Sequence, residues 1–493
     1  MAFASLDFPP GVYRPGTEYA AKGRFYDANL TRWAPLLQPI GGWQTHSAAS
    51  AMSGAARAIV SWRDNAGNAW IGIGTHSNLY VQSADGTQYT ITPSGFVAGR
   101  ADPSYNLGYG GGFYGQGTYG SPRAAAGPSL PATVWTLDTF GQYLVGCSLD
   151  DGNLYEWTLN TSSLAVAITN APTSCTGLVT TPEKFLFALG AAGVKRRVQW
   201  CDQASETSWA VSSTSQAGSK DLETRGSILC GKALHGVTLI FTDVDVWAAT
   251  YLGYPLVYGF ERLDQNCGAI SQGCVAILDR QAVWMGKDRF WMFNGANIVP
   301  LESDVQDYVF SDINASNNSK VTSGHNSKFG EIWWFYCSAA ASENDRYVFW
   351  NYRYKYWGMG QLGRLAWADK GVFNYPVATD SGGLLYDHER GFNYGGAVVY
   401  AETAPLEIGD GDFLGEVQAI IPDEKTLGDV NVTLKGKYWP SGAETTYGPY
   451  ALTSQVSVLV QAAQLKVRFT GVNAADWRVG SFRLDIVKGD PHL

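Results

Sequence analysis

Charged residues are scarce in this sequence. Asp, Glu, Lys and Arg make up 16% of the 493 residues, whereas about 25% is usual in soluble domains. Long tracts of Ala, Leu, Glu and Lys, which helix-rich chains contain, are absent. Aromatic residues reach 13% and glycine occurs 57 times. Low charge combined with many aromatic and β-branched residues favours strands over helices.

Patterns that indicate metal or nucleophile chemistry are also missing. The sequence has seven cysteines, an odd number. No two of them form a C-x-x-C pair, and no Cys/His cluster has zinc spacing. The six histidines are scattered without a pair at i, i+4, and no G-x-S-x-G elbow occurs. We therefore predict that the chain is not an enzyme and has no catalytic residue, cofactor or metal site.

Neither a membrane span nor a basic surface is indicated. No run approaches the roughly 18 apolar residues of a membrane helix, and the N-terminus has no secretory pattern. The net charge of −9 argues against a chain that clamps nucleic acid through a basic face. It is compatible with a wall past which DNA slides without sticking.

One stretch matches a nucleotide-binding fingerprint by spacing alone. GQGTYG, at 115–120, has the spacing G-x-G-x-x-G, which needs a strand before it and a helix after it. The preceding YGGGFY is not an apolar strand, and Pro122 and Pro128 interrupt any following helix. Asp138 lies at about the distance of a ribose ligand, but without a helix between them this spacing carries little weight. We interpret the stretch as part of a Gly/Tyr-rich loop.

A repeated pattern of short apolar runs begins near residue 56. Four runs lie within residues 58–92, separated by turn residues that include Asp85-Gly86. Asp-Gly between alternating runs predicts a hairpin, because both residues tolerate positive φ. Four antiparallel strands over this length correspond to one blade of a β-propeller.

The pattern recurs as far as about residue 395. Residues 133–169 again contain four runs, and Asn78-Leu79-Tyr80 and Asn153-Leu154-Tyr155 occupy the same third-strand position. Such self-similarity is typical of repeat folds. We predict an all-β chain with a β-propeller of six or seven blades over 56–395 and a loop insertion at about 100–132. A set of stacked β-sandwiches is the alternative.

The two ends of the chain differ from this repeat. Residues 1–55 are irregular and contain prolines at 9, 10, 15, 35 and 39, so we expect an extended N-terminal docking arm, which binds either its own core or a neighbouring protein. Residues 396–493 alternate regularly over longer runs, which predicts a C-terminal β-sandwich.

The strongest enzyme-like pattern is the run Ser148-Leu149-Asp150-Asp151-Gly152-Asn153. It matches the first part of the sialidase Asp box, a structural hairpin turn distant from the catalytic centre. The match supports a propeller hairpin and not hydrolysis. A glycosidase needs two facing carboxylates, and no spacing in the sequence identifies such a pair.

The order of several motifs resembles structural proteins of short-tailed bacteriophages. They are PPGVYRPGTEYAAKGRFYDANLTRW (9–33), PIGGW (39–43), WMGKDRFW (284–291) and SDVQDYVF (303–310). In its organisation the whole chain looks like a tail nozzle, also called tail tubular protein B. No catalytic motif defines this family, so the resemblance assigns no site residue.

The resemblance implies a homohexameric ring in the virion tail, assembled in the cytoplasm of the bacterial host. The ring would contact the tail adaptor and tail fibre or spike proteins, and would serve as a gated DNA exit conduit without sequence-specific binding. The Gly/Tyr-rich loop is then a candidate gate or intersubunit clasp. Its candidate contact residues are Tyr105, Tyr109, Phe113, Tyr114 and Tyr119. A disordered insertion is the alternative for this loop.

Two further functions fit the sequence. A propeller can bind glycans, or act as a glycosidase, on the host surface, which predicts a carboxylate-lined pocket at its centre. A propeller can also be a scaffold that binds peptides.

Overall fold

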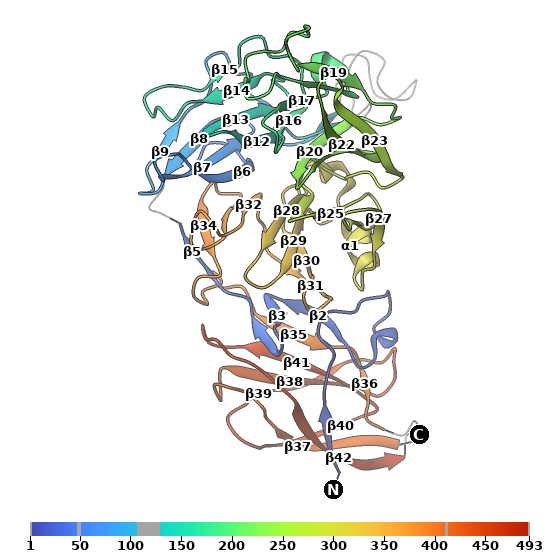
Figure 1. Cartoon of the computed structure of the whole chain (residues 1–493). Helices are drawn as coiled ribbons and strands as arrows, with labels where there is room; N and C mark the ends of the chain where they lie inside the picture. Colours follow the sequence, from blue (N-terminus) through green and yellow to red (C-terminus); the bar gives the residue numbers. More distant parts are fainter. Residues whose placement is uncertain (1, 47–50, 106–128, 410–412, 492–493) are drawn as a thin grey trace, which may run out of the picture.

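The protein consists of a disc of small antiparallel sheets joined to a sandwich of two larger sheets (Figure 1). The computed structural model describes residues 2–46, 51–105, 129–409 and 413–491. Within these ranges the helices are short: α1 (Gln306–Asp312), η1 (Tyr19–Ala21), η2 (Ala191–Gly193) and η3 (Ala315–Lys320), the last three being 3-10 helices. The predicted all-β class is therefore confirmed.

Six sheets of the disc contain four strands that follow one another in the sequence. The first three are β6 (Ala56–Arg63), β7 (Ala69–Thr75), β8 (Leu79–Ser83), β9 (Gln88–Thr90); β12 (Trp135–Phe140), β13 (Tyr143–Ser148), β14 (Leu154–Trp157), β15 (Val166–Ala167); and β16 (Gly177–Thr180), β17 (Leu186–Leu189), β18 (Arg197–Trp200), β19 (Gly218–Asp221). The next three are β20 (Ile228–Leu234), β21 (Val237–Thr242), β22 (Asp245–Gly253), β23 (Val257–Gln265); β24 (Val275–Leu278), β25 (Gln281–Met285), β26 (Phe290–Phe293), β27 (Ile298–Leu301); and β28 (Thr322–Asn326), β29 (Glu331–Tyr336), β30 (Arg346–Asn351), β31 (Tyr356–Gln361).

The seventh sheet combines the two ends of the disc sequence. It contains β32 (Ala366–Ala368), β33 (Val377–Thr379), β34 (Leu385–His388) and, from near the N-terminus, β5 (Trp43–Thr45). The strand β5 runs antiparallel to β34. The first strands of the seven sheets follow one another around an axis, and β32 packs against β6. The disc is a closed seven-bladed β-propeller, which confirms the predicted fold.

The local turn chemistry also agrees with the prediction. Asp85-Gly86 lies in the turn between β8 and β9, where Gly86 has a φ of 89° and its N–H donates to the Ser83 carbonyl over 2.9 Å. The Asp-box-like run forms the turn between β13 and β14, and Gly152 has a φ of 73°. Both are positive-φ positions that favour glycine.

Neighbouring blades come close together where a tryptophan covers a glycine. A Cβ atom on Gly74 would lie 2.4 Å from Cγ of Trp135, which belongs to the next blade. A Cβ atom on Gly324 would lie 2.5 Å from Cγ of Trp367, again in the next blade. The indole rings therefore occupy space that any other residue at these glycines would fill.

The second unit is a sandwich of two antiparallel sheets. One sheet has the order β1 (Ala2–Leu6), β42 (Phe482–Pro491), β37 (Phe413–Ile421), β40 (Val456–Ala462). The other has the order β2 (Phe25–Asn29), β35 (Tyr400–Thr403), β41 (Gln464–Gly471), β38 (Val430–Lys437), β39 (Thr445–Ala451), with β36 (Leu406–Glu407) also paired to β41. The C-terminal sandwich is thus confirmed.

The described part of the N-terminal segment packs on its own chain, which is one of the two alternatives expected for it. Residues 1–55 were predicted to form an extended docking arm. Their described part supplies β1 and β2 to the sandwich, β5 to the seventh blade, and a hairpin of β3 (Thr31–Trp33) and β4 (Leu37–Pro39) between the two units. The prolines prevent long helices but leave room for these short strands.

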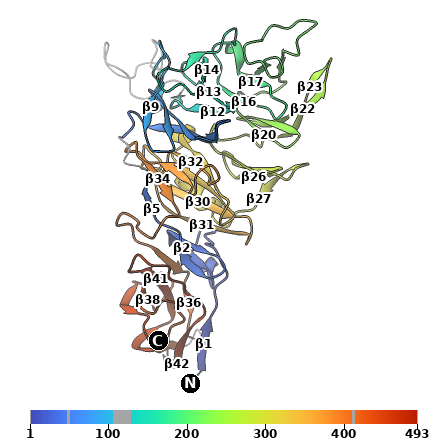
Figure 2. The ribbon, with the colours of Figure 1, turned by 60° about the vertical axis from the view of Figure 1, so that its left-hand side comes forward.

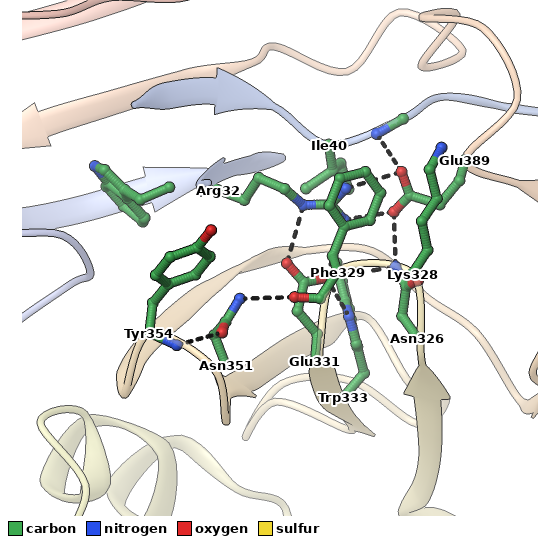
Figure 3. A network of polar contacts seen from close by, with 12 residues as sticks. Arg32, Ile40, Asn326, Lys328, Phe329, Glu331, Trp333, Asn351, Tyr354 and Glu389 are labelled. Carbon is green, nitrogen blue, oxygen red and sulfur yellow. Dashed lines mark hydrogen bonds and ion pairs between the residues drawn. The ribbon is translucent and has the colours of Figure 1, made fainter. Parts of the chain in front are cut away.

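A buried ionic network holds the junction between the propeller and the sandwich (Figure 3). Arg32, on β3, lies between Glu331 of the sixth blade and Glu389, which follows the seventh blade. The Arg32 Nε–Glu331 Oε1 distance is 2.9 Å, and Arg32 Nη1 donates to Glu389 Oε2 over 2.9 Å. The Nε–H does not point at the Glu331 oxygen, so that contact is an ion pair and not a hydrogen bond. The Phe329 ring covers the guanidinium at 3.7 Å, and Asn326 donates to Glu389 over 2.9 Å.

The balance of charge in this network alters the protonation of its members. Burial raises the pKa of Glu331 to about 7, and the carboxylate of Glu389 adds to the rise while Arg32 opposes it. Burial also disfavours the charge on Arg32, but the two carboxylates outweigh this effect and raise its pKa. One guanidinium therefore faces two acids, and Glu331 binds a proton more readily than an ordinary glutamate.

We predict that Arg32→Met strongly destabilises the fold. Two carboxyl groups would remain buried without their cation, which costs about 3–5 kcal/mol of unfolding free energy. Urea denaturation followed by tryptophan fluorescence measures this loss. The control is Arg197→Met, which breaks a more exposed ion pair with Asp221 (2.7 Å) and is expected to cost less than about 1 kcal/mol. Equal effects of the two substitutions would contradict the prediction.

Glu331 also predicts a pH dependence of stability. An acid whose pKa is higher in the folded protein keeps its proton there while the unfolded chain loses its own, so stability falls as pH rises from 4.5 to about 7. The difference in unfolding free energy between the native protein and Glu331→Gln should change by about 3 kcal/mol over this window, since one pKa unit corresponds to about 1.4 kcal/mol. Urea denaturation of both proteins from pH 4.5 to 8 measures the difference. A constant difference across this range would refute the raised pKa.

Candidate functional site

The predicted Gly/Tyr-rich site falls mostly on residues that are not described. Tyr109, Phe113, Tyr114 and Tyr119 lie outside the described residues, as does the GQGTYG stretch. Tyr105 ends the strand β10 (Ser104–Tyr105), which pairs with β11 (Ser129–Leu130). The structure thus gives the two-stranded ribbon from which the loop leaves the propeller. Its role as a gate or clasp stays a prediction.

The aromatic-rich strands belong largely to the core. All residues of β29 (Glu331–Tyr336) are buried, which agrees with the interpretation of Trp333-Trp334-Phe335-Tyr336 as core. In the following run 352–357, Tyr356 and Trp357 are buried whereas Tyr354 is exposed.

The propeller encloses an axial cavity of about 430 Å³. This volume is within the range of small-molecule sites, roughly 300–1,000 Å³. All seven blades contribute to its wall, mainly through their first strands. The polar residues of the wall that the structure describes include Arg57, Thr136, Asp138, Thr180, Lys232, Gln272, Thr322, Ser323, His325 and Asp369.

Asp138, on β12, faces the axis and links two blades. Its carboxylate accepts hydrogen bonds from the backbone N–H of Thr180, in the third blade, and from that of Thr139, each over 2.8 Å. Burial raises the pKa of Asp138, while these hydrogen bonds and the charge of Lys232 partly oppose the rise. The carboxyl group thus combines fixed geometry with an increased affinity for a proton.

His325 and Asp369 form a second polar group in the wall. His325 Nδ1 lies 3.4 Å from an oxygen of Asp369, and Nε2 lies 3.1 Å from the Tyr352 hydroxyl. Burial lowers the pKa of His325, although the carboxylate of Asp369 acts in the opposite direction. The imidazole is therefore mainly neutral at neutral pH.

These groups give the axial cavity the means for proton transfer. A carboxyl group whose pKa is raised holds its proton more readily than an ordinary aspartate and can act as a proton donor, and a neutral imidazole can accept a proton. Perturbed acids and bases that converge on a cavity are typical of functional sites. Arg57 differs from the other charged residues of the wall, since its guanidinium pairs with Glu343, with an Nη2–Oε1 distance of 2.6 Å.

The sequence patterns did not indicate this group of residues. Asp138 stood out only for its distance from the Gly-rich stretch, and no pattern marked Lys232, His325 or Asp369 as site residues. A signal that could have found them is their position on or next to the first strand of each repeat, since those strands surround the axis of a propeller.

Metal-binding clusters and membrane-spanning helices are both absent from the described ranges. In that part of the chain no three His, Cys, Asp or Glu side chains are grouped so that they could hold a metal ion. No helix found there has the length and apolar character that crossing a membrane requires.

The comparisons with known proteins give similarity at the level of fold. Neither the protein families nor the curated proteins give a match. Selenomethionine-substituted virginiamycin B lyase from Staphylococcus aureus is similar over 70% of this chain and 98% of its own, with a TM-score of 0.44 and 7% identity. The Pan2 WD40 domain of Neurospora crassa is similar over 71% of this chain and 94% of its own, with a TM-score of 0.40 and 8% identity.

The prediction that the chain is not an enzyme needs correction. Virginiamycin B lyase is an enzyme, and the similar structures include a catalytically inactive form of it with quinupristin (TM-score 0.42, 7% identity, 70% of this chain and 98% of that chain). The prediction that this chain is not an enzyme is therefore withdrawn. At such low identity the similarity concerns the fold and assigns no activity to this chain.

Proposed function

We propose that this protein is a structural subunit of a bacteriophage short tail, a tail nozzle that forms a homohexameric ring around a DNA exit conduit. The support for this family is the resemblance of the sequence motifs to those of tail nozzle proteins. The observation that supports ring formation is an apolar hairpin tip at the rim of the propeller.

The hairpin of β22 and β23 stands out from the disc (Figure 2). The two strands have nine residues each. At the tip, Leu252, Tyr254 and Leu256 are 57%, 68% and 71% exposed. Exposed apolar groups gathered in this way are typical of contacts between proteins. A tip that binds a different surface of the next copy makes a head-to-tail contact, and such contacts form a ring when the rotation between successive copies closes.

The hairpin is held against the third blade by Tyr258, close to the tip, so the tip is presented in a defined position. Tyr258 packs edge-on against Phe187 of the third blade, with ring centroids 4.8 Å apart. Its hydroxyl lies 2.8 Å from the Thr181 hydroxyl and donates to Glu183 over 3.1 Å. A tip held in this way loses little conformational freedom when it binds a partner.

The dimensions of the axial cavity bear on the path of DNA. The axial cavity of one propeller, about 430 Å³, has the size of a small-molecule site. Under this proposal the DNA duplex therefore passes through the centre of the ring of subunits and not through a single propeller. A subunit with a net charge of −9 suits such a passage, because basic walls would retain DNA by releasing its counterions.

We predict that replacing the three apolar tip residues by lysine prevents ring assembly. The purified protein should form six-fold rings in negative-stain images and a hexamer in light scattering. The variant with Leu252→Lys, Tyr254→Lys and Leu256→Lys should remain a monomer, because buried lysines lack partners at the contact.

The matched control is Leu459→Lys, at a position on the sandwich that is 73% exposed. This substitution should leave the rings unchanged. Rings that persist in the triple variant would show that the hairpin tip does not form the contact between subunits. A native protein that is monomeric at all concentrations would contradict the proposal of a tail nozzle.

A second candidate function is action on host-surface glycans at the axial cavity. The observation that favours it is the raised pKa of Asp138, with Asp369 as a second carboxyl group in the wall. The test is release of reducing sugar from purified bacterial surface polysaccharide. Asp138→Asn should abolish the release, whereas Asp307→Asn, at an exposed position on α1, should not. No release, or release that Asp138→Asn leaves intact, would reject this candidate.

A further inference from the structure

A second cavity lies on the face of the propeller where the chain passes from one blade to the next. This crossover pocket has a volume of about 530 Å³. The connections that precede β12, β16, β20, β24 and β28 contribute most of its lining. The crossover pocket touches the axial cavity, since Gln272 lines both.

The walls of the crossover pocket are mainly aliphatic. They include Leu130, Pro131, Val134, Leu149, Ile228, Leu229, Ile270 and Ala315. Leu130 and Ala315 are exposed at the rim, whereas Val134, Ile228 and Ile270 are buried. A ligand that fills this cavity would remove apolar surface from water.

Two residues that line the pocket carry a buried oxygen atom that lacks a hydrogen-bond donor within the described part of the chain. Gln272 is 8% exposed, and its amide nitrogen donates to the Thr176 carbonyl over 2.8 Å. This hydrogen bond fixes the orientation of the amide, so Oε1 is directed away from Thr176. Among the described residues no donor reaches Gln272 Oε1, and the same holds for Oδ1 of Asn318. Buried acceptors without a donor cost free energy, so a ligand that carries N–H or O–H groups is favoured here.

The charges around the crossover pocket do not select an ionic ligand. Arg100 is paired with Asp150, with an Nη2–Oδ1 distance of 2.5 Å, and it also donates to the Pro131 carbonyl over 3.2 Å. Lys195 is exposed at the rim. The lining of the pocket thus combines aliphatic walls with two residues, Gln272 and Asn318, that carry neutral acceptors.

A strand edge lies beside these walls. The ribbon of β10 and β11 has two strands, and Leu130 of β11 lines the pocket. An extended peptide can add to such an edge through its backbone while a side chain enters a neighbouring pocket. Peptide N–H groups are also the donors that the two amide oxygens lack.

We propose that the crossover pocket binds a short extended peptide segment of a partner protein, with an aliphatic side chain against Ile228 and Ile270 and backbone N–H groups directed at Gln272 Oε1 and Asn318 Oδ1. This site is separate from the hairpin tip, and it does not depend on ring formation.

The test uses the full chain and saturation-transfer NMR with N-acetyl-Leu-Leu-N-methylamide as the probe. The same molecule with glycine in place of leucine is the control ligand. The leucine compound should bind and the glycine compound should bind at least about tenfold more weakly, because it lacks the apolar side chains. Equal binding of the two compounds, or no binding of the leucine compound, would overturn the proposal.

Two variants in the pocket and one control outside it locate the binding site. Ala315→Trp, at an exposed rim position, fills the pocket without altering the core, and Gln272→Met removes the buried acceptor while keeping the side-chain length. Each should weaken binding about tenfold or more. The matched control is Gln464→Met in the sandwich, where another buried glutamine oxygen has no donor among the described residues, and it should leave binding unchanged.

Other occupants are distinguished in the same experiments. Preferential binding of glucose or N-acetylglucosamine over the leucine compound would reject the peptide and assign the pocket to a sugar. A change in oligomer size caused by Ala315→Trp would assign it to a second copy of the chain. Unaltered leucine binding in Ala315→Trp would place the probe elsewhere and overturn the proposal.

Discussion

The closure of the propeller by β5 is the constraint on which the rest of the structure depends. A ring of sheets is stable when its last blade packs against its first, and here the last blade is completed by Trp43–Thr45. The same N-terminal segment places Arg32 between Glu331 and Glu389 before it reaches β5, and it has already contributed β1 and β2 to the sandwich. The propeller and the sandwich are therefore tied together by one continuous stretch of chain, and neither is complete without it.

This arrangement gives the molecule three regions with different side chains: the axis of the propeller, the crossover face and the rim. Around the axis, first strands of the blades fix Asp138 and the His325–Asp369 pair through backbone and side-chain contacts. At the crossover face, connections between blades leave aliphatic walls and two buried side-chain amide oxygens, of Gln272 and Asn318, that no donor among the described residues reaches. At the rim, two long strands extend beyond their neighbours and expose an apolar tip. The apolar tip residues line neither the axial cavity nor the crossover pocket.

Features that depend on neighbouring residues were predictable from the sequence. Asp85-Gly86 specified a hairpin because its backbone accepts positive φ, and the alternation of Val430–Lys437 specified a strand with one buried face. Features that depend on distant residues were not. Asp138 attracted notice for a nucleotide fingerprint, yet its environment is formed by Thr180 and Lys232, on other blades. The acids that surround Arg32, Glu331 and Glu389, lie 299 and 357 positions away in the sequence.

The amino-acid sequence by itself determined the all-β class, the repeat of four-stranded units and the C-terminal sandwich. Period-two alternation and turn chemistry act over a few residues, so each strand carries this information locally. Tertiary structure alone decided that there are seven blades, that the N-terminal segment completes both units, and which polar groups meet in the two cavities and at the junction. Those outcomes depend on strands and side chains far apart in the chain, whose partners are selected by ring closure and burial and not by any local pattern.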